Sequence, residues 1–91
     1  MSDKNNSKQN LIRLTFSVTG KKITIEKVNI HQPLKVSVQK AITESGSTRP
    51  IEDYEVIFNN VKLDINQKVE SFNFPADAII FVSLKTGQGG I

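Results

Sequence analysis

Hydrophobic and polar residues alternate in two neighbouring stretches near the start of the chain. In residues 11–19 every second residue is apolar, and the same pattern returns in residues 23–28 after an interruption at Gly20-Lys21-Lys22. A period of two is typical of a strand with one buried face. A short connection that contains glycine joins two such strands in a β-hairpin. The first stretch places four apolar side chains on one face: Ile12, Leu14, Phe16 and Val18.

The pattern changes to a helical period after Pro33. Leu34, Val38, Ala41 and Ile42 are spaced to form one apolar stripe of an amphipathic helix. Proline fits the first turn of a helix, where its missing N–H costs nothing. Gly46 is placed to end the helix in a left-handed conformation.

The second half of the chain returns to strand patterns. Tyr54–Phe58 and Val61–Leu63 predict two strands joined at Asn59-Asn60, because asparagine tolerates the positive φ of a tight turn. Residues 64–75 predict an irregular segment anchored by Val69, Phe72 and Phe74. Residues 78–85 form the most apolar run and predict a central strand that is buried on much of both faces. Segregated strands and helix indicate an α+β fold with the helix packed across one sheet.

Composition limits the classes of function. The 91 residues suffice for one small domain, and they contain no cysteine, which excludes disulfides, thiolate zinc sites and a cysteine nucleophile. The net charge of +3 comes mainly from scattered lysines, without the basic stripe or interleaved aromatics of a nucleic-acid binder. No apolar run approaches the length of a membrane span, and no signal peptide is visible, so we expect a cytoplasmic protein.

No constellation of side chains predicts catalysis. His31 is the only histidine, and the acidic residues Glu52, Asp53 and Glu55 lack partners that would make them an acid–base pair. We therefore expect no enzymatic activity, no catalytic or metal-binding residues and no cofactor.

The two ends of the chain differ from the middle. Residues 1–10 are polar throughout, which predicts a disordered leader before a domain at residues 11–85. Residues 86–91 contain three of the five glycines and predict a flexible tail.

Four motifs in order resemble ubiquitin and the β-grasp modifiers. Residues 18–26 resemble the first ubiquitin hairpin, L-T-G-K-T-I-T-L-E, and Val56-Ile57-Phe58 with Lys62-Leu63 resembles L-I-F-A-G-K-Q-L. Residues 69–74 resemble L-S-D-Y-N-I, and Gly89-Gly90 resembles the terminal diglycine. The resemblance covers residues 11–90 and implies a β-grasp fold, a mixed sheet with one main helix across it.

Two departures set the chain apart from ubiquitin. Phe72 replaces the tyrosine of L-S-D-Y-N-I, and residues 85–88 lack the arginines that precede the diglycine of ubiquitin. These differences suggest a divergent, bacterial relative that is served by its own set of enzymes.

The resemblance implies a protein modifier that is conjugated through its diglycine. The Gly90 carboxylate, preceded by Gly89, would be adenylated with ATP, passed to an enzyme thiol and delivered to a target lysine. Ile91 follows Gly90, so a deconjugating-type peptidase would first remove it. The implied partners are activating-type and conjugating-type enzymes, that peptidase and target proteins, with no nucleic acid or membrane, and we expect a monomer.

The resemblance also implies a recognition surface beside the tail. If Val56 and Phe58 face the helix, Ile57 faces solvent, and the alternation of the last strand directs Phe81 outward and Ile80, Val82 and Leu84 inward. Ile57 and Phe81 would then form an exposed apolar patch, as in ubiquitin, which Val18 could join.

Two other functions remain open at this stage. A sulfur carrier shares the β-grasp fold and the diglycine, and would convert Gly90 into a thiocarboxylate. A ubiquitin-like interaction module would never be conjugated, and its diglycine would be dispensable.

Overall fold

The computed structural model of the protein describes residues 10–85. Within them the chain forms one sheet and one α-helix, α1 (Leu34–Glu44), with short 3-10 helices η2 (Ile51–Asp53) and η3 (Val69–Phe72). The strands are β1 (Leu11–Val18), β2 (Lys21–Asn29), β3 (Tyr54–Phe58), β4 (Val61–Lys62) and β5 (Ile79–Leu84).

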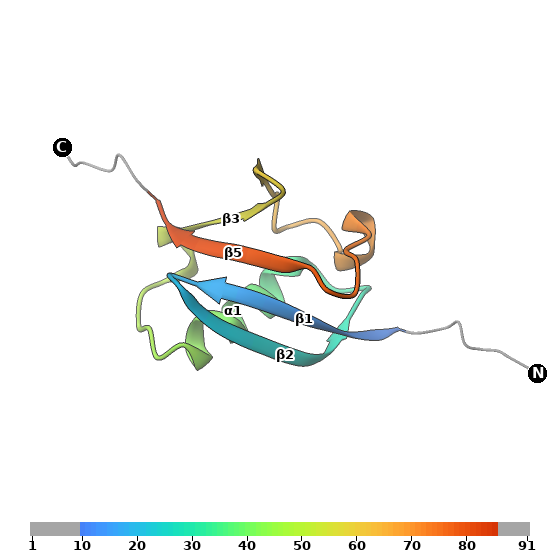
Figure 1. The fold of residues 1–91 in the computed structure, drawn as a ribbon, viewed down its shortest axis with the longest axis horizontal. Coiled ribbons are helices and arrows are strands. Elements are labelled where there is room, and N and C mark those ends of the chain that lie inside the picture. Colours follow the sequence, from blue (N-terminus) through green and yellow to red (C-terminus); the bar gives the residue numbers. More distant parts are fainter. Residues whose placement is uncertain (1–9, 86–91) are drawn as a thin grey trace, which may run out of the picture.

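The five strands lie in the order β2-β1-β5-β3-β4. The central pair, β1 and β5, is parallel, and all other neighbours are antiparallel. Figure 1 shows α1 packed behind the sheet, while the opposite face is turned toward the viewer. The α+β class, the mixed sheet and the single main helix are thus confirmed, and β5 is central.

The core lies between the sheet and α1. The alternation in β1 buries Leu14, Phe16 and Val18, and the helical stripe buries all four predicted residues. Each fully buried aliphatic or aromatic side chain contributes about 1.5–3 kcal/mol, so the two patterns together fix which face of each element points inward. The exposed side of α1 carries Lys35, Gln39 and Lys40.

The first turn lies one residue earlier than the sequence pattern predicted. Thr19 and Gly20 form the turn with φ angles of 46° and 92°, and Lys21 already belongs to β2. Two successive positive φ angles are typical of a two-residue type I′ hairpin. The prediction that Gly20-Lys21-Lys22 forms the turn was therefore wrong, because the turn needs only two residues.

The ends of α1 follow the chemistry of proline and glycine. Pro33 is the N-cap with an extended ψ of 147°, so it precedes the first helical residue instead of occupying it. At the other end Gly46 has a φ of 91°, its N–H donates to Thr43 O at 3.0 Å, and Ser47 N donates to Ile42 O at 3.4 Å. This pair of bonds is a Schellman motif, which confirms the predicted glycine stop.

The irregular segment before β5 is anchored by the three predicted apolar residues. Val69 is buried, and the Phe72 ring stacks on Phe74 with 5.2 Å between centroids. Phe74 in turn meets Phe58 edge to face at 5.3 Å. The segment is therefore held by packing on the core, as predicted.

Two expectations concern parts of the chain that the structure does not describe. The predicted disordered leader (residues 1–10, apart from Asn10) and the predicted flexible tail (86–91) lie outside residues 10–85. Among residues 10–85 there is no helix with the length and apolar character to cross a membrane.

Candidate recognition surface

The sheet face opposite α1 carries a small apolar centre. Ile57 on β3 and Phe81 on β5 are direct cross-strand partners, and both point away from the core because Val56 and Val82, their chain neighbours, form the buried pair beside them. Phe81 is 49% exposed, and Ile57 is half-buried. Paired side chains on one face lie about 5 Å apart, so the two form one contiguous surface, which we call the outer patch.

Two lysines flank the outer patch across the sheet. Phe81 is also the register partner of Ser17 on β1, and Ser17 pairs with Lys22 on β2. On the other side Ile57 pairs with Lys62 on β4. One row across all five strands therefore reads Lys22, Ser17, Phe81, Ile57, Lys62. Strands lie about 4.8 Å apart, so the two lysine backbones are separated by about 19 Å.

Val18 does not belong to this surface. Its side chain is 0% exposed and lies in the core, and its register partner on β5 is the buried Val82. The two-residue turn keeps Val18 in the strand, so the alternation that buries Leu14 and Phe16 also buries Val18. The suggestion that Val18 joins the patch was therefore wrong.

The predicted inward direction of Leu84 is confirmed, because its register partner Tyr54 is a buried core residue. Ile80 and Val82 are fully buried, but Leu84 is 36% exposed because it is the last residue of β5 and lies at the end of the sheet. Phe81 is exposed on the opposite face, so β5 is buried on one face only, and the prediction of burial on much of both faces was wrong.

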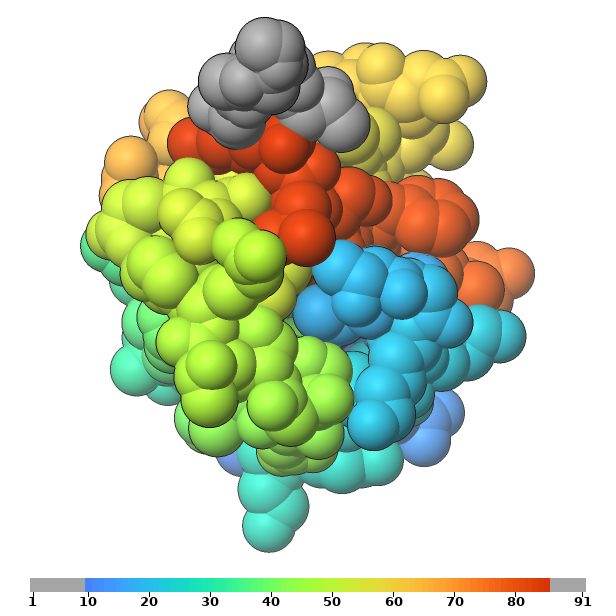
Figure 2. Space-filling view, turned by 90° about the vertical axis from the view of Figure 1, so that its left-hand side faces the viewer, coloured from blue at the N-terminus to red at the C-terminus, as the bar shows by residue number. Residues whose placement is uncertain are grey.

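The end of β5 is enclosed by charged residues. Lys85 N donates to Asp53 O at 2.9 Å, and Arg49 Nη1 lies 3.3 Å from Asp53 Oδ2. Together with Glu52 and Leu84 these residues line a groove of about 550 Å³. Figure 2 looks onto this end, where residues 45–53 (yellow-green) and the β1–β2 turn (blue) lie beside the end of β5 (red).

Asp53 and Glu55 of the acidic cluster take part in ordinary surface ion pairs, and His31 lies beside a carboxylate. Besides the Asp53 pair, Glu55 Oε1 lies 4.0 Å from Lys62 Nζ, and His31 Nδ1 lies 3.6 Å from Glu70 Oε2. Within residues 10–85, no group of three histidine or acidic side chains could hold a metal ion. The candidate conjugation and processing residues Gly89, Gly90 and Ile91 lie outside the described residues.

The flanking lysines were not predicted, although the sequence contains the signal. A two-residue turn at Thr19-Gly20 pairs Ser17 with Lys22, and one at Asn59-Asn60 pairs Ile57 with Lys62. Both pairings follow once the turn lengths are known, because a hairpin turn fixes the register of its strands.

Comparison with known proteins places the fold. A designed protein based on ubiquitin superposes with a TM-score of 0.72 and 18% identity, over 90% of this chain and 98% of the other. A chain from a structure described as "Molecular Mimicry of SUMO promotes DNA repair" superposes with a TM-score of 0.71 and 19% identity, over 84% and 94% of the two chains. Both show that the fold is the ubiquitin-like β-grasp.

At the level of sequence, no curated protein matches the chain. A family model does match, over residues 7–90, and its description is "Protein of Unknown function (DUF2604)". The match spans the whole domain and extends to Gly90. The chain therefore belongs to the DUF2604 family and has a ubiquitin-like fold.

Proposed function

We propose that the protein is a ubiquitin-like modifier, conjugated to target amines through the carboxylate of Gly90. The observation that carries the proposal is the combination of a ubiquitin-like domain with Gly89-Gly90 shortly after its last strand. Five residues follow Lys85 up to Gly90, so an extended connection would reach about 17 Å from the end of β5. That distance suits delivery of a carboxylate into an enzyme cleft while the domain stays outside.

Conjugation proceeds through removal of Ile91, one adenylyl transfer and then two acyl transfers. Peptidase cleavage of the Gly90–Ile91 bond frees the Gly90 carboxylate. A carboxylate oxygen attacks the α-phosphorus of ATP and releases pyrophosphate, an enzyme thiolate then displaces AMP, and a lysine amine finally displaces the thiol to give an amide. Glycine at positions 89 and 90 suits these steps, because no side chain crowds the carbonyl carbon under attack.

The outer patch is proposed as the surface that partner enzymes and receptors recognise. Aromatic and aliphatic side chains at the centre of a surface with charged surroundings are typical of the part of an interface that contributes most affinity. Lys22 and Lys62 at the two ends of the row favour partners that carry acidic residues on both sides of an apolar contact.

The first test is activation of the carboxylate. Chains that end at Gly90 and at Ile91 are incubated with ATP and an extract of the source organism, and adenylate formation is followed by isotope exchange between pyrophosphate and ATP. We expect exchange with the chain that ends at Gly90, and with the longer chain only after Ile91 is removed. Exchange with the longer chain alone, or with neither, would contradict the proposal.

The same incubation separates the alternatives. A sulfur carrier would gain one sulfur in place of oxygen at Gly90 and form no adducts with proteins. A ubiquitin-like interaction module would form no adenylate, and removal of Gly89, Gly90 and Ile91 would leave its binding unchanged.

A further inference from the structure

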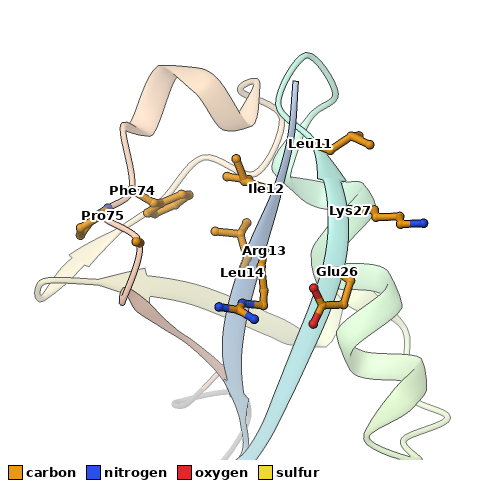
Figure 3. A pocket seen from close by; sticks show the side chains of 9 residues that line it. Leu11, Ile12, Arg13, Leu14, Glu26, Lys27, Phe74 and Pro75 are labelled. Atoms are coloured by element: carbon orange, nitrogen blue, oxygen red, sulfur yellow. The ribbon is translucent and has the colours of Figure 1, made fainter. Parts of the chain in front are cut away.

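Within residues 10–85, the first residues of β1 form an open strand edge beside a groove. The register with β5 runs from Thr15↔Ile79 to Val18↔Val82, so residues 11–14 have no β5 partner on one side, while Leu11, Ile12 and Leu14 pair with β2 on the other. A groove of about 490 Å³ lies along this part of β1. Its wall on the open side is formed by Phe74, Pro75 and Ala76. Figure 3 shows Ile12 extending from β1 toward Phe74, with Glu26 and Lys27 on the opposite side.

The backbone of Leu11 and Arg13 faces this open edge. Asn10 O accepts from Ile30 N at 2.9 Å, so even-numbered residues of β1 direct their backbone groups toward β2. Thr19 N donates to Val82 O at 2.9 Å, which places the groups of odd-numbered residues on the β5 side. Because N–H and C=O directions alternate along a strand, Leu11 and Arg13 present theirs where β5 has not yet begun.

The side chains along the edge select the chemistry of a partner. An added strand would place alternate side chains beside Ile12 and Phe74, which are half-buried and apolar. The remaining side chains would point to the outer face, beside Leu11, which is 48% exposed, and Arg13. Arg13 and Lys27 outweigh Glu26 in charge at the groove.

We propose that the edge of β1 at residues 11–14 binds an extended peptide segment of a partner protein, in which apolar residues alternate with acidic ones. The segment would add a strand to the sheet, with apolar side chains over Ile12 and Phe74 and a carboxylate beside the Arg13 guanidinium. A second copy of the chain is a poorer occupant, since pairing two such edges would bring two Arg13 side chains onto one face. The site lies at the opposite end of β1 from the turn that adjoins the end of β5, so it is independent of conjugation through Gly90.

The test uses synthetic seven-residue peptides that alternate valine with glutamate or, as the control, valine with lysine. Binding is followed by NMR shifts and by hydrogen exchange of the Leu11 and Arg13 amides. We expect saturable binding of the glutamate peptide, shifts confined to residues 11–14 and 74–76, and slowed exchange at Leu11 and Arg13. The charge-reversed variant Arg13→Glu should weaken the glutamate peptide about fivefold to tenfold at low salt and favour the lysine peptide.

A second pair of peptides tests strand addition without changing the protein. N-methyl groups on the amides that face β1 should abolish binding, whereas N-methyl groups on the outward amides should leave it within about twofold. Equal effects of the two patterns would overturn the proposal. So would the absence of saturation, shifts centred on Ile57 and Phe81, or protection of Arg13 that grows with protein concentration and indicates a second copy.

Discussion

Adjacent residues of β5 should respond very differently to truncation, because the strand divides the core from the outer patch. Val82 is 0% exposed and is the register partner of Val18 and Val56, which are also buried. Val82→Ala removes two buried carbons, which costs about 1.6 kcal/mol at about 0.8 kcal/mol each. The cavity that remains raises the expected loss to about 2–3 kcal/mol.

Phe81→Thr is the matched change on the other face. About half of the Phe81 side chain already contacts water, and threonine keeps the β propensity of the position. We therefore expect a loss of about 1 kcal/mol or less. For a domain of this size each kcal/mol lowers Tm by about 4–8 °C, so Val82→Ala should lower it by about 8–24 °C and Phe81→Thr by at most about 8 °C.

Urea unfolding, followed by far-UV circular dichroism, measures the loss in free energy of unfolding for both variants. The denaturant slope must stay constant for the difference in midpoint to report stability. If Phe81→Thr costs as much as Val82→Ala, the assignment of the two sheet faces is refuted, and with it the outer patch.

Three further changes test local features of the fold and its surface by the same unfolding assay or by binding. Thr19→Asn should stabilise the domain by about 0.5–1 kcal/mol, because Thr19 is β-branched with a φ of 46° and asparagine accepts that conformation more readily. Destabilisation would mean that the hydrogen bond from the Thr19 hydroxyl to Val18 O, at 2.7 Å, contributes more than the backbone strain costs. Lys27→Gly should raise the free energy of unfolding by about 1 kcal/mol, since Lys27 has a φ of 57° where the β1–β2 register shifts. An unchanged urea midpoint would argue against backbone strain at this bulge. Ile57→Glu should weaken capture of partner proteins from an extract at least tenfold. The control variant Gln39→Glu, on the exposed side of α1, should leave capture unchanged. Equal loss in both variants would exclude the outer patch as the recognition surface.

Local patterns predicted the fold because they were strong and mutually consistent. The period of two in β1, the stripe of α1 and the glycine at its end each specify one conformation, and all three appear in the structure. Thr19 shows the limit of such patterns. The turn it forms depends on a positive φ that threonine rarely adopts, so the sequence pointed to the next residues instead.

The outer patch was predictable only in part, because it depends on pairing between distant segments. Alternation alone separated Ile57 and Phe81 from their buried neighbours. It could not place Val18, whose facing depends on the turn length. It also could not give the exposure of Leu84, which depends on where the sheet ends. The open edge of β1 also needed the structure, because it arises where β5 begins, at Ile79.

The mass of the adducts formed through Gly90 is the most direct test of the proposed function. The chain that ends at Gly90 is incubated with ATP and the extract, and its adducts are digested and sequenced by mass spectrometry, with Gly90→Ala as the control. The account predicts ATP-dependent amide bonds between the Gly90 carbonyl and lysine Nζ atoms of other proteins, strongly reduced for Gly90→Ala. Adducts that form without ATP or at residues other than Gly90, or a Gly90 carboxylate that stays unmodified, would contradict it.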